Sequence, residues 1–254
     1  MTVTVMPVPA LRDNYIWLLG DPAEGTAAIV DPPEAGPALA ALRQAGLRLE
    51  TILNTHHHWD HVGGIGEVKD ATAARVFGPP GSAARIPVDA EVGEGERITV
   101  LGRPVEVLAV PGHTLDHIAY VFPEDDLLLC GDTLFAMGCG RIFEGTPEMM
   151  WSSLDRLRQL PGRMRVCCAH EYTLANGRFA LGVEPGNPDL VARMKEVESL
   201  RRQGRPTLPS TIALERATNP FLRPESPEIR ARLGLEEADN VTVFARLRAL
   251  KDRA

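Results

Sequence analysis

The sequence is poor in the features that mark membrane-spanning, secreted or disulfide-stabilised proteins. No apolar run approaches the length needed to cross a bilayer, and the first residues lack the basic segment and apolar segment of a typical secretory signal. Only 4 cysteines occur among 254 residues, and none form a C-x-x-C pair. This usage argues against a disulfide framework or a structural zinc ribbon. We therefore expect reduced thiols and a cytoplasmic protein.

An excess of positive charge is also missing. Lysine and arginine total 27 against 34 acidic residues, which gives a formal net charge of -7 and a pI of about 5.5. Such a balance offers no bulk attraction to nucleic acid or to anionic membranes, so neither is expected as a partner. The chain also lacks G-x-S-x-G, the motif that presents a nucleophilic serine. A monomer or a weak homo-oligomer is expected.

The residues that are present have the composition of a globular protein, with 44% hydrophobic and 24% charged residues. Strand-like and helix-like segments alternate as far as residue 173, including a strand in "TAAIVDPP" and a helix in "TPEMMWSSLDRLRQL" with Thr146 as its N-cap and Pro147 at its first position. Beyond residue 173 the segments are helical and are separated by proline-rich connectors. The pattern predicts an α/β domain over residues 1–173 and a smaller helical domain over residues 174–254.

Four of the 7 histidines fall in one stretch, "THHHWDHVGG". A solvated polar loop or an unspecific metal-binding patch is one interpretation. A preformed metal site is the other. Because alternate side chains of an extended segment point the same way, His56 and His58 can meet one ion, while the adjacent Asp60 and His61 can serve a second. Gly63 and Gly64 would then let the backbone pass close to its neighbours and start a helix.

Further residues of the same chemistry follow the ends of other strand-like runs. These are Asp31, His113 in "VPGHT", Asp132 in "CGDTLF" and His170 in "CCAHE". A single such residue is ordinarily a hydrogen-bonded turn residue, but a recurring set at strand ends is better explained by a site. Imidazole with carboxylate suits zinc, iron or manganese. Without Asp31, the set still holds five histidines and two aspartates, namely His56, His58, His61, His113, His170, Asp60 and Asp132. Seven ligands exceed one tetrahedral ion, and they fit two ions if Asp132 bridges them.

At this point the chain resembles a known superfamily. The order "T-H-x-H-x-D-H", "P-G-H-T", "G-D-T-L-F" and "H-E-Y-T" resembles the metallo-β-lactamase signature. More closely, "GCGRIFEG", "HEYT", "VEPGN", "PTLPST" and "NPFLR" resemble the hydroxyacylglutathione hydrolases, or glyoxalase II enzymes, across nearly the whole chain. The resemblance implies an α/β fold: an αββα sandwich with metals at one edge, and a smaller all-helical C-terminal domain that binds glutathione.

The resemblance also implies roles for single residues. His56, His58 and His113 would hold the first metal, and Asp60, His61 and His170 the second. Asp132 and a hydroxide would bridge the two ions. Asp31 would orient a ligand, and Asp60 would also be able to shuttle a proton. His57 would be a packed or hydrogen-bonded turn residue rather than a ligand. Two divalent ions per chain are thus expected, with zinc favoured and iron or manganese as alternatives.

Substrate contacts are implied at five further positions: Arg141, Phe143, Tyr172, Arg248 and Lys251. Arg141 replaces the lysine of the best-known pattern, and Phe143 replaces a tyrosine and so loses a hydroxyl. Asp116 stands where the family usually has glycine. Without the resemblance, Arg248 and Lys251 would be read as a solvated helix face.

The implied reaction is hydrolysis of a thioester, S-(2-hydroxyacyl)glutathione. With S-D-lactoylglutathione the products are glutathione and D-lactate, the second step of methylglyoxal detoxification. Cys130 and Cys139 lie in apolar or glycine-rich contexts without an obvious base, so no cysteine nucleophile is expected.

Four alternatives share some of these features. A β-lactamase would use the same metals but would normally be exported. A processing nuclease would need a nucleic-acid groove, which the acidic balance disfavours. A glutathione-persulfide dioxygenase would bind one iron and typically lack the helical tail. A non-catalytic metal-binding module would have closed coordination, whereas seven ligands around two ions leave room for solvent.

Overall fold

The computed structural model describes residues 3–253, which form two compact units. The first unit runs to Ala109 and includes Asp116–Gly131, and the second consists of Val110–Leu115 and the chain from Asp132 onward. This division lies at a different place from the expected boundary after residue 173. Residues 1, 2 and 254, which the expected domain bounds include, lie outside the described residues.

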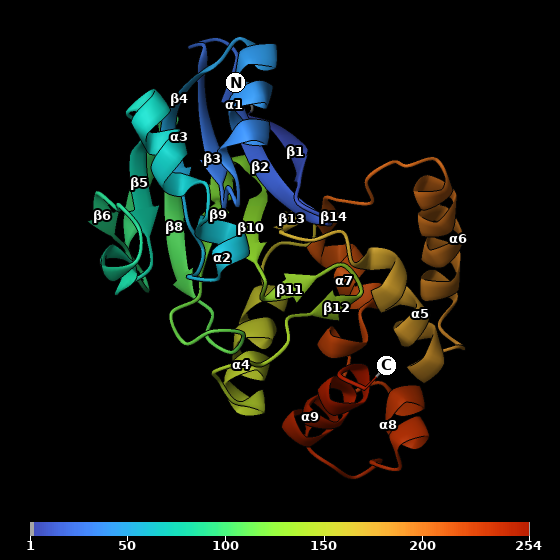
Figure 1. The fold of residues 1–254 in the computed structure, drawn as a ribbon. Coiled ribbons are helices and arrows are strands. Elements are labelled where there is room, and N and C mark those ends of the chain that lie inside the picture. Colours follow the sequence, from blue (N-terminus) through green and yellow to red (C-terminus); the bar gives the residue numbers. More distant parts are fainter. Residues whose placement is uncertain (1–2, 254) are drawn as a thin grey trace. The chain divides into compact units, whose positions relative to one another are not determined.

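The first unit holds a six-stranded sheet with helices against one face (Figure 1). Its strands lie in the order β1 (Thr4–Ala10), β2 (Asn14–Asp21), β3 (Thr26–Val30), β4 (Arg48–Leu53), β5 (Arg75–Gly78) and β6 (Ala90–Glu91). Its helices are α1 (Ala35–Ala45), α2 (Trp59–Val62), α3 (Ile65–Thr72) and the short η1 (Ser82–Ala84) and η2 (Pro123–Asp125).

Successive side chains of β2 point to opposite faces of the sheet, and those on both faces are buried. Ile16 and Leu18 pack in one apolar cluster with Ala38 and Leu42 of α1. The intervening Trp17 points to the opposite face and is also buried. Each fully buried side chain of this size stabilises the fold by about 1.5–3 kcal/mol relative to exposure. The interiors of β2 and β3 are therefore apolar, and their polar residues lie at the strand ends.

Four antiparallel strands of the first unit form part of a second sheet: β7 (Arg97–Val100), β8 (Arg103–Ala109), β9 (Ile118–Phe122) and β10 (Leu127–Gly131). A tight hairpin joins β7 to β8, in which Leu101 and Gly102 link the two strands with positive φ at both residues. The buried Tyr120 of β9 donates its hydroxyl proton to the carbonyl oxygen of Asn54 at 2.9 Å. This bond ties the second sheet to the loop that follows β4.

The parallel run β3–β4–β5 places the loops after β3 and β4 at the same edge of the first sheet. Asp31 follows β3 directly, and His56 lies in the loop after β4. Gly63 and Gly64 pass so close to the backbone of the loop after β3 that an added Cβ would clash with Pro33 and Glu34. The expected role of these glycines, close backbone approach at the start of a helix, is confirmed by Gly64, which is the N-cap of α3.

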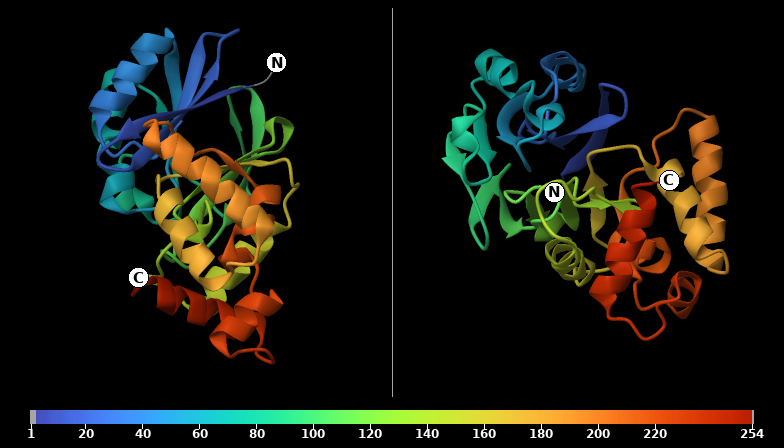
Figure 2. Two further views of the ribbon diagram at one scale, coloured as in Figure 1. Left: turned by 90° about the vertical axis from the view of Figure 1, so that its right-hand side faces the viewer. Right: turned by 60° about the horizontal axis from the view of Figure 1, so that its bottom comes forward.

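The second unit is mainly helical (Figure 2). Its strands are β11 (Leu134–Phe135), β12 (Gly138–Cys139), β13 (Arg165–Cys168) and β14 (Ser210–Thr211). Its helices are α4 (Pro147–Arg158), α5 (Thr173–Val183), α6 (Pro188–Arg202), α7 (Ile212–Thr218), η3 (Pro220–Leu222), α8 (Pro227–Leu233) and α9 (Asn240–Lys251).

Helix α4 begins as the sequence predicts. The Thr146 side chain accepts from the backbone N–H of Met149, and Pro147 occupies the first turn. Helices α5 and α6 lie side by side (Figure 2) and share an apolar cluster with Met137. Shorter elements were not predicted, among them the β1–β2 hairpin, α7 and α8. Their apolar runs are too short to show a clear period.

Buried polar side chains tie α7 and the following turn to the β11–β12 hairpin. Asn219 donates to the carbonyl oxygens of Phe135 and Gly138 at 3.0 and 2.9 Å, and the backbone N–H of Met137 donates to Glu215 at 2.8 Å. Arg193 pairs with Glu215 at 2.5 Å, so the buried carboxylate is neutralised. The hairpin is thus fixed by groups far along the chain.

Among the described residues, no helix combines the length and apolar character needed to cross a membrane.

Candidate metal centre

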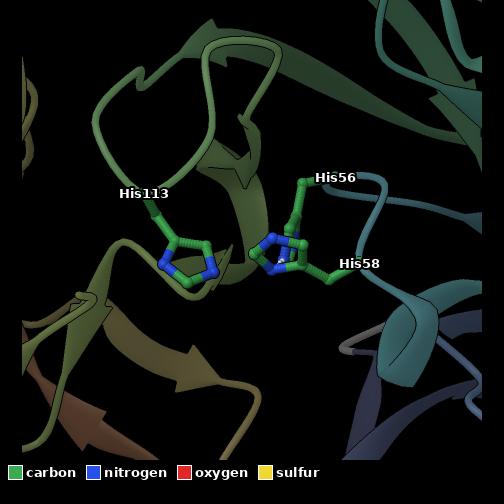
Figure 3. A group of neighbouring side chains, drawn as sticks. All are labelled: His56, His58 and His113. Carbon is green, nitrogen blue, oxygen red and sulfur yellow. Dashed lines mark hydrogen bonds between the residues drawn. The ribbon is translucent and has the colours of Figure 1, made fainter. Parts of the chain in front are cut away.

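In the first unit, His56 and His58 lie on one loop with their rings directed at one another (Figure 3). His56 Nε2 lies 3.1 Å from His58 Nδ1. His57, between them, instead bonds through Nδ1 to both carboxylate oxygens of Asp116, at 3.0 and 2.9 Å. The histidines at alternate positions, His56 and His58, thus lie together. This alternation separates two histidines of one direction from a third that is hydrogen-bonded elsewhere.

Asp31 fixes the loop that carries His56 by accepting hydrogen bonds from it. It has a positive φ of 50° and accepts from the backbone N–H and the hydroxyl of Thr55, at 2.8 and 2.6 Å. The same carboxylate lies 3.1 Å from His61 Nδ1. The structure therefore places Asp31 in contact with one predicted ligand directly and with the residue before another.

These bonds decide which nitrogen of each ring carries the proton. A carboxylate only accepts, so His61 Nδ1 donates to Asp31 and Nε2 carries the lone pair. The Thr55 hydroxyl donates its only proton to Asp31. Its oxygen can therefore only accept from His56 Nδ1, which lies 3.1 Å away. His56 Nε2 then also carries a lone pair. Ligand atoms of Asp31, His56 and His61 all lie within 4.8 Å of one another.

Asp60 and His117 also lie in this group of side chains of the first unit. Asn14 donates to the backbone oxygen and to a carboxylate oxygen of Asp60, at 3.0 and 3.2 Å. His117 is fully buried and stacks on His56, with ring centroids 4.5 Å apart. Its role as a support for His56 was missed in the sequence. The signal that could have found it is its place directly before the apolar strand "IAYVF".

In the second unit, one carboxylate faces two histidines. Asp132 Oδ2 lies 3.5 Å from His113 Nε2, and Asp132 Oδ1 lies 3.4 Å from His170 Nε2. Each oxygen therefore serves a different ring. Asp132, the residue expected to bridge two ions, thus lies between two of the other expected ligands.

His113 and His170 each have a further contact that fixes the ring orientation. His113 Nδ1 donates to the carbonyl oxygen of Arg141 at 2.7 Å, which leaves the lone pair on Nε2. Tyr172 stacks on His170 with centroids 4.7 Å apart and planes 3° apart. Phe143 meets His113 edge to face at 5.3 Å. Both aromatic side chains are exposed, so a bound molecule can reach them.

The donor set fits divalent cations that bind nitrogen and oxygen. His56, His61, His113, Asp132 and His170 are all buried. Burying this many ionisable groups is unfavourable unless they are paired or coordinate a metal. Imidazole nitrogens beside carboxylates suit zinc, iron or manganese rather than calcium or magnesium. The clustered imidazoles and carboxylates thus support a divalent metal site.

The three basic residues expected to bind substrate differ in exposure. Arg248 is 7% exposed and donates to the carbonyl oxygen of Cys139 at 2.9 Å. Lys251 is half-buried, with its ammonium 5.6 Å from the ring centre of Phe179. Arg141 is mostly exposed, and its Nε lies 3.3 Å from Asp252. The solvated helix face considered for Arg248 is therefore wrong, because packing in the second unit covers its guanidinium.

The cysteines have the properties of core residues. Burial raises the pKa of Cys139 to about 11 and that of Cys168 to about 12, and it raises the pKa of Cys167 well above the ordinary value of a thiol. Cys130 is also buried, and among the described residues none of the four cysteines is in a disulfide. A thiol that stays protonated at neutral pH is a poor nucleophile.

Two family models cover almost the entire chain. The model of the metallo-beta-lactamase superfamily matches residues 11–170, and the model of the hydroxyacylglutathione hydrolase C-terminus matches residues 171–254. A hydroxyacylglutathione hydrolase of Methylococcus capsulatus is 54% identical over 249 residues, which covers 98% of this chain and 97% of the relative. One of Synechococcus sp. (strain JA-3-3Ab) is 55% identical over 251 residues, covering 98% and 99%.

Solved structures have the same fold. ETHE1 from Myxococcus xanthus superposes with a TM-score of 0.65 at 25% identity, covering 99% of this chain and 98% of that one. The BLEG-1 B3 metallo-beta-lactamase has a TM-score of 0.65 at 20% identity, covering 87% and 100%. TTHA1623, solved in a di-iron-bound form, has a TM-score of 0.60 at 26% identity, covering 86% and 100%. The expected metallo-β-lactamase fold with a helical C-terminal part is confirmed.

Proposed function

The chain belongs to the hydroxyacylglutathione hydrolases of the metallo-beta-lactamase superfamily, and on that premise we propose that it hydrolyses S-(2-hydroxyacyl)glutathione to glutathione and a 2-hydroxy acid. The substrate class follows from the relatives, which match over the full chain at about 50% identity. S-D-lactoylglutathione is the proposed substrate and D-lactate the proposed acid, which would place the reaction second in methylglyoxal detoxification.

We propose that the predicted ligands hold two divalent ions. His56, His58 and His113 would bind one ion, Asp60, His61 and His170 the other, and Asp132 both. The proposal is supported by the proton positions deduced above, which leave Nε2 of His56, His61 and His113 as the coordinating atom. Zinc is favoured, with iron or manganese as alternatives that the same donors accept.

Bound ions of this kind supply Lewis acidity at the thioester carbonyl and lower the pKa of a water molecule towards neutrality. The chain's own groups hold the ligands and position the substrate. Asp31 fixes His61 and, through Thr55, His56. Asn14 donates to Asp60, which in this proposal accepts a proton in addition to binding an ion. Water adds to the carbonyl carbon, the C–S bond breaks, and the thiolate of glutathione leaves and takes up a proton.

Substrate recognition is proposed for the helical domain over residues 174–254 and for the loop before it. Phe143 and Tyr172 are exposed and flank His113 and His170, so they can contact the acyl group or the glutathionyl chain. Arg141 and Lys251 offer positive charge for the substrate's carboxylates. The boundary near residue 173 is supported by the change of family model between residues 170 and 171.

Localisation and assembly remain parts of this proposal. The buried, reduced thiols are compatible with a cytoplasmic enzyme. A small-molecule partner is proposed, with neither nucleic acid nor membrane, in a monomer or weak homo-oligomer.

The single observation that carries the proposal is the carboxylate of Asp132, with one oxygen towards each of two buried histidines. The test is release of free thiol from S-D-lactoylglutathione by the purified protein. We expect turnover that a chelator abolishes and that divalent metal restores. Hydrolysis of a β-lactam without thioester hydrolysis would reassign the protein within the superfamily, as would oxygen consumption with glutathione persulfide. Metal binding without any turnover would identify a non-catalytic module.

A further inference from the structure

A short hairpin lies between Asp132 and residues 140–143, which carry two of the proposed substrate contacts and are called the substrate loop. The hairpin strands, β11 and β12, return the chain to its starting point, where the backbone N–H of Gly140 donates to the carbonyl oxygen of Thr133 at 3.1 Å. A Cβ on Gly140 would clash with the carbonyl oxygen of Asp132, so only glycine allows this approach. The substrate loop therefore begins against the backbone of Asp132.

The substrate loop also lies against the backbone near His113. The N–H of Phe143 donates to the carbonyl oxygen of His113, and the N–H of Gly145 donates to that of Gly112, both at 3.2 Å. The hairpin is the direct link in the chain between Asp132 and this loop. Its shape therefore decides where the substrate loop lies relative to the proposed metal ligands of the second unit.

Asparagine side chains from the helical part hold the tip of this hairpin. Asn219, at the end of α7, donates to the carbonyl oxygens of Phe135 and Gly138 at 3.0 and 2.9 Å. Asn176 of α5 donates to the carbonyl oxygen of Ala136 at 3.2 Å. Both asparagines are buried, and α5 lies beside β12 (Figure 1). Three carbonyl groups of the tip are thus bound by side chains from much later in the chain.

Met137, the remaining residue of the tip, is held by a charged group. Its φ of 54° is a conformation that residues with a Cβ rarely adopt. Its N–H donates to Glu215 Oε2 at 2.8 Å. Glu215 is fully buried, and its other oxygen accepts from Arg193 at 2.5 Å and from the hydroxyl of Ser210. Arg193 compensates the buried charge and leaves Glu215 as a strong acceptor for the Met137 N–H.

Three side chains therefore fix the backbone of the tip and are called the hairpin clamp: Asn176, Glu215 and Asn219. We propose that the hairpin clamp consists of positioning residues that set the place of the substrate loop relative to Asp132. The inference rests on the proposed function, in which Asp132 binds the ions and the substrate loop contacts glutathione. The helical part then aligns the thioester for attack in addition to contacting it.

Glu215→Gln tests the clamp with little change of shape. A carboxylate offers two acceptor oxygens, whereas an amide offers one and adds a donor. Either the Met137 N–H or Arg193 then loses its acceptor. Glu184→Gln is the matched control, because Glu184 is also buried in the helical part. Its side-chain bonds are to residues outside the hairpin, namely Asn187, Arg223 and Ser226.

The measurement compares two thioesters at a temperature where all the proteins are folded. S-D-lactoylglutathione has carboxylates for the substrate loop, whereas S-D-lactoyl-N-acetylcysteamine has the same acyl group and no carboxylate. For Glu215→Gln we expect kcat/KM for the glutathione thioester to fall about tenfold or more, the effect of a misplaced substrate. Its kcat/KM for the short thioester and its bound metal should stay at the wild-type values. Glu184→Gln should match the wild type on both substrates.

Asn176→Ala provides a second test if Glu215→Gln fails to fold. It removes the donor to the Ala136 carbonyl and should show the same selective loss, smaller in size. Equal losses on the two thioesters, or no loss on either in a folded variant, would overturn the inference. A wild-type protein that hydrolyses neither thioester would instead refute the proposed function.

Discussion

Asp116 holds Nδ1 of His57 with both carboxylate oxygens, at 3.0 and 2.9 Å. Arg85 lies 3.8 Å from the same carboxylate, so the pair is part of a small ionic group in the first unit. The contact gives a physical role to an aspartate that replaces the glycine usual in the resembled family. It anchors the residue between His56 and His58 and turns it away from their shared direction.

His57→Ala should therefore keep most of the bound metal, whereas His56→Ala and His58→Ala should each lose it. The cost of His57→Ala should appear in stability, at about 1 kcal/mol for a partly buried, charge-assisted hydrogen bond. Elemental analysis and urea unfolding of the three variants test this prediction. A loss of metal in His57→Ala equal to that of its neighbours would refute the argument from alternation.

Asp132→Ala should lose both metals and nearly all activity, because its two oxygens face the nitrogens of two different histidines. Asp132→Asn is the matched variant, since the amide keeps the shape but offers only one acceptor atom. We expect it to retain at most one equivalent by elemental analysis. Two equivalents in Asp132→Ala would show that Asp132 is no bridge.

Lys251 should give the Michaelis constant a dependence on alkaline pH. Burial lowers the pKa of Lys251 from its ordinary value of 10.5, and the nearby charge of Arg248 lowers it as well. A lowered pKa means that the ammonium loses its charge at a lower pH than a free lysine does. KM for the anionic thioester should therefore rise as pH increases through that lowered value, with kcat changing less.

Lys251→Arg tests this dependence, because arginine stays charged throughout the range. Its KM should remain flat where that of the wild type rises. Lys251→Ala should raise KM at neutral pH by about tenfold, the equivalent of one charge-assisted hydrogen bond of roughly 1.5 kcal/mol, without loss of metal. An unchanged KM in Lys251→Ala would remove this residue from the substrate site.

Glu184 should contribute stability that is lost in acid. Burial acts to raise its pKa, but hydrogen bonds from Arg223, Ser226 and Asn187 outweigh burial, and the pKa is lowered. For a carboxyl with a lowered folded-state pKa, the stabilisation is present above the ordinary value of 4.5 and is lost as pH falls through the folded-state value. Glu184→Gln should lower the free energy of unfolding by about 2–4 kcal/mol near neutral pH.

The difference between Glu184→Gln and the wild type should shrink as the pH is lowered below the folded-state pKa of Glu184. The exposed Glu237→Gln is the control and should change stability little at any pH. Denaturant unfolding at neutral and acidic pH measures both variants. A difference that stays constant with pH would mean that the charge of Glu184 does not stabilise the helical part.

The sequence by itself singled out the residues with metal-ligand chemistry and predicted how they are directed along an extended segment. His56 and His58 were separated from His57 by side-chain alternation, which is a local property of extended backbone. Asp31, His113, Asp132 and His170 were found because apolar strand-like runs end just before them. The start of α4 could likewise be predicted from the sequence, because Thr146 and Pro147 favour a helix start through local contacts and local backbone geometry.

Only the tertiary structure decided what these side chains touch. His57 and Asp116 are 59 positions apart, and Arg248 and Cys139 are 109 apart, so packing of distant segments chose both pairs. The sequence alone made Arg248 a residue of an open helix face, because helical spacing does not reveal what packs against that face. Proton positions on His56, His61 and His113 also depended on the fold, since a ring's tautomer is set by the acceptor it meets, and that acceptor is supplied by another part of the chain.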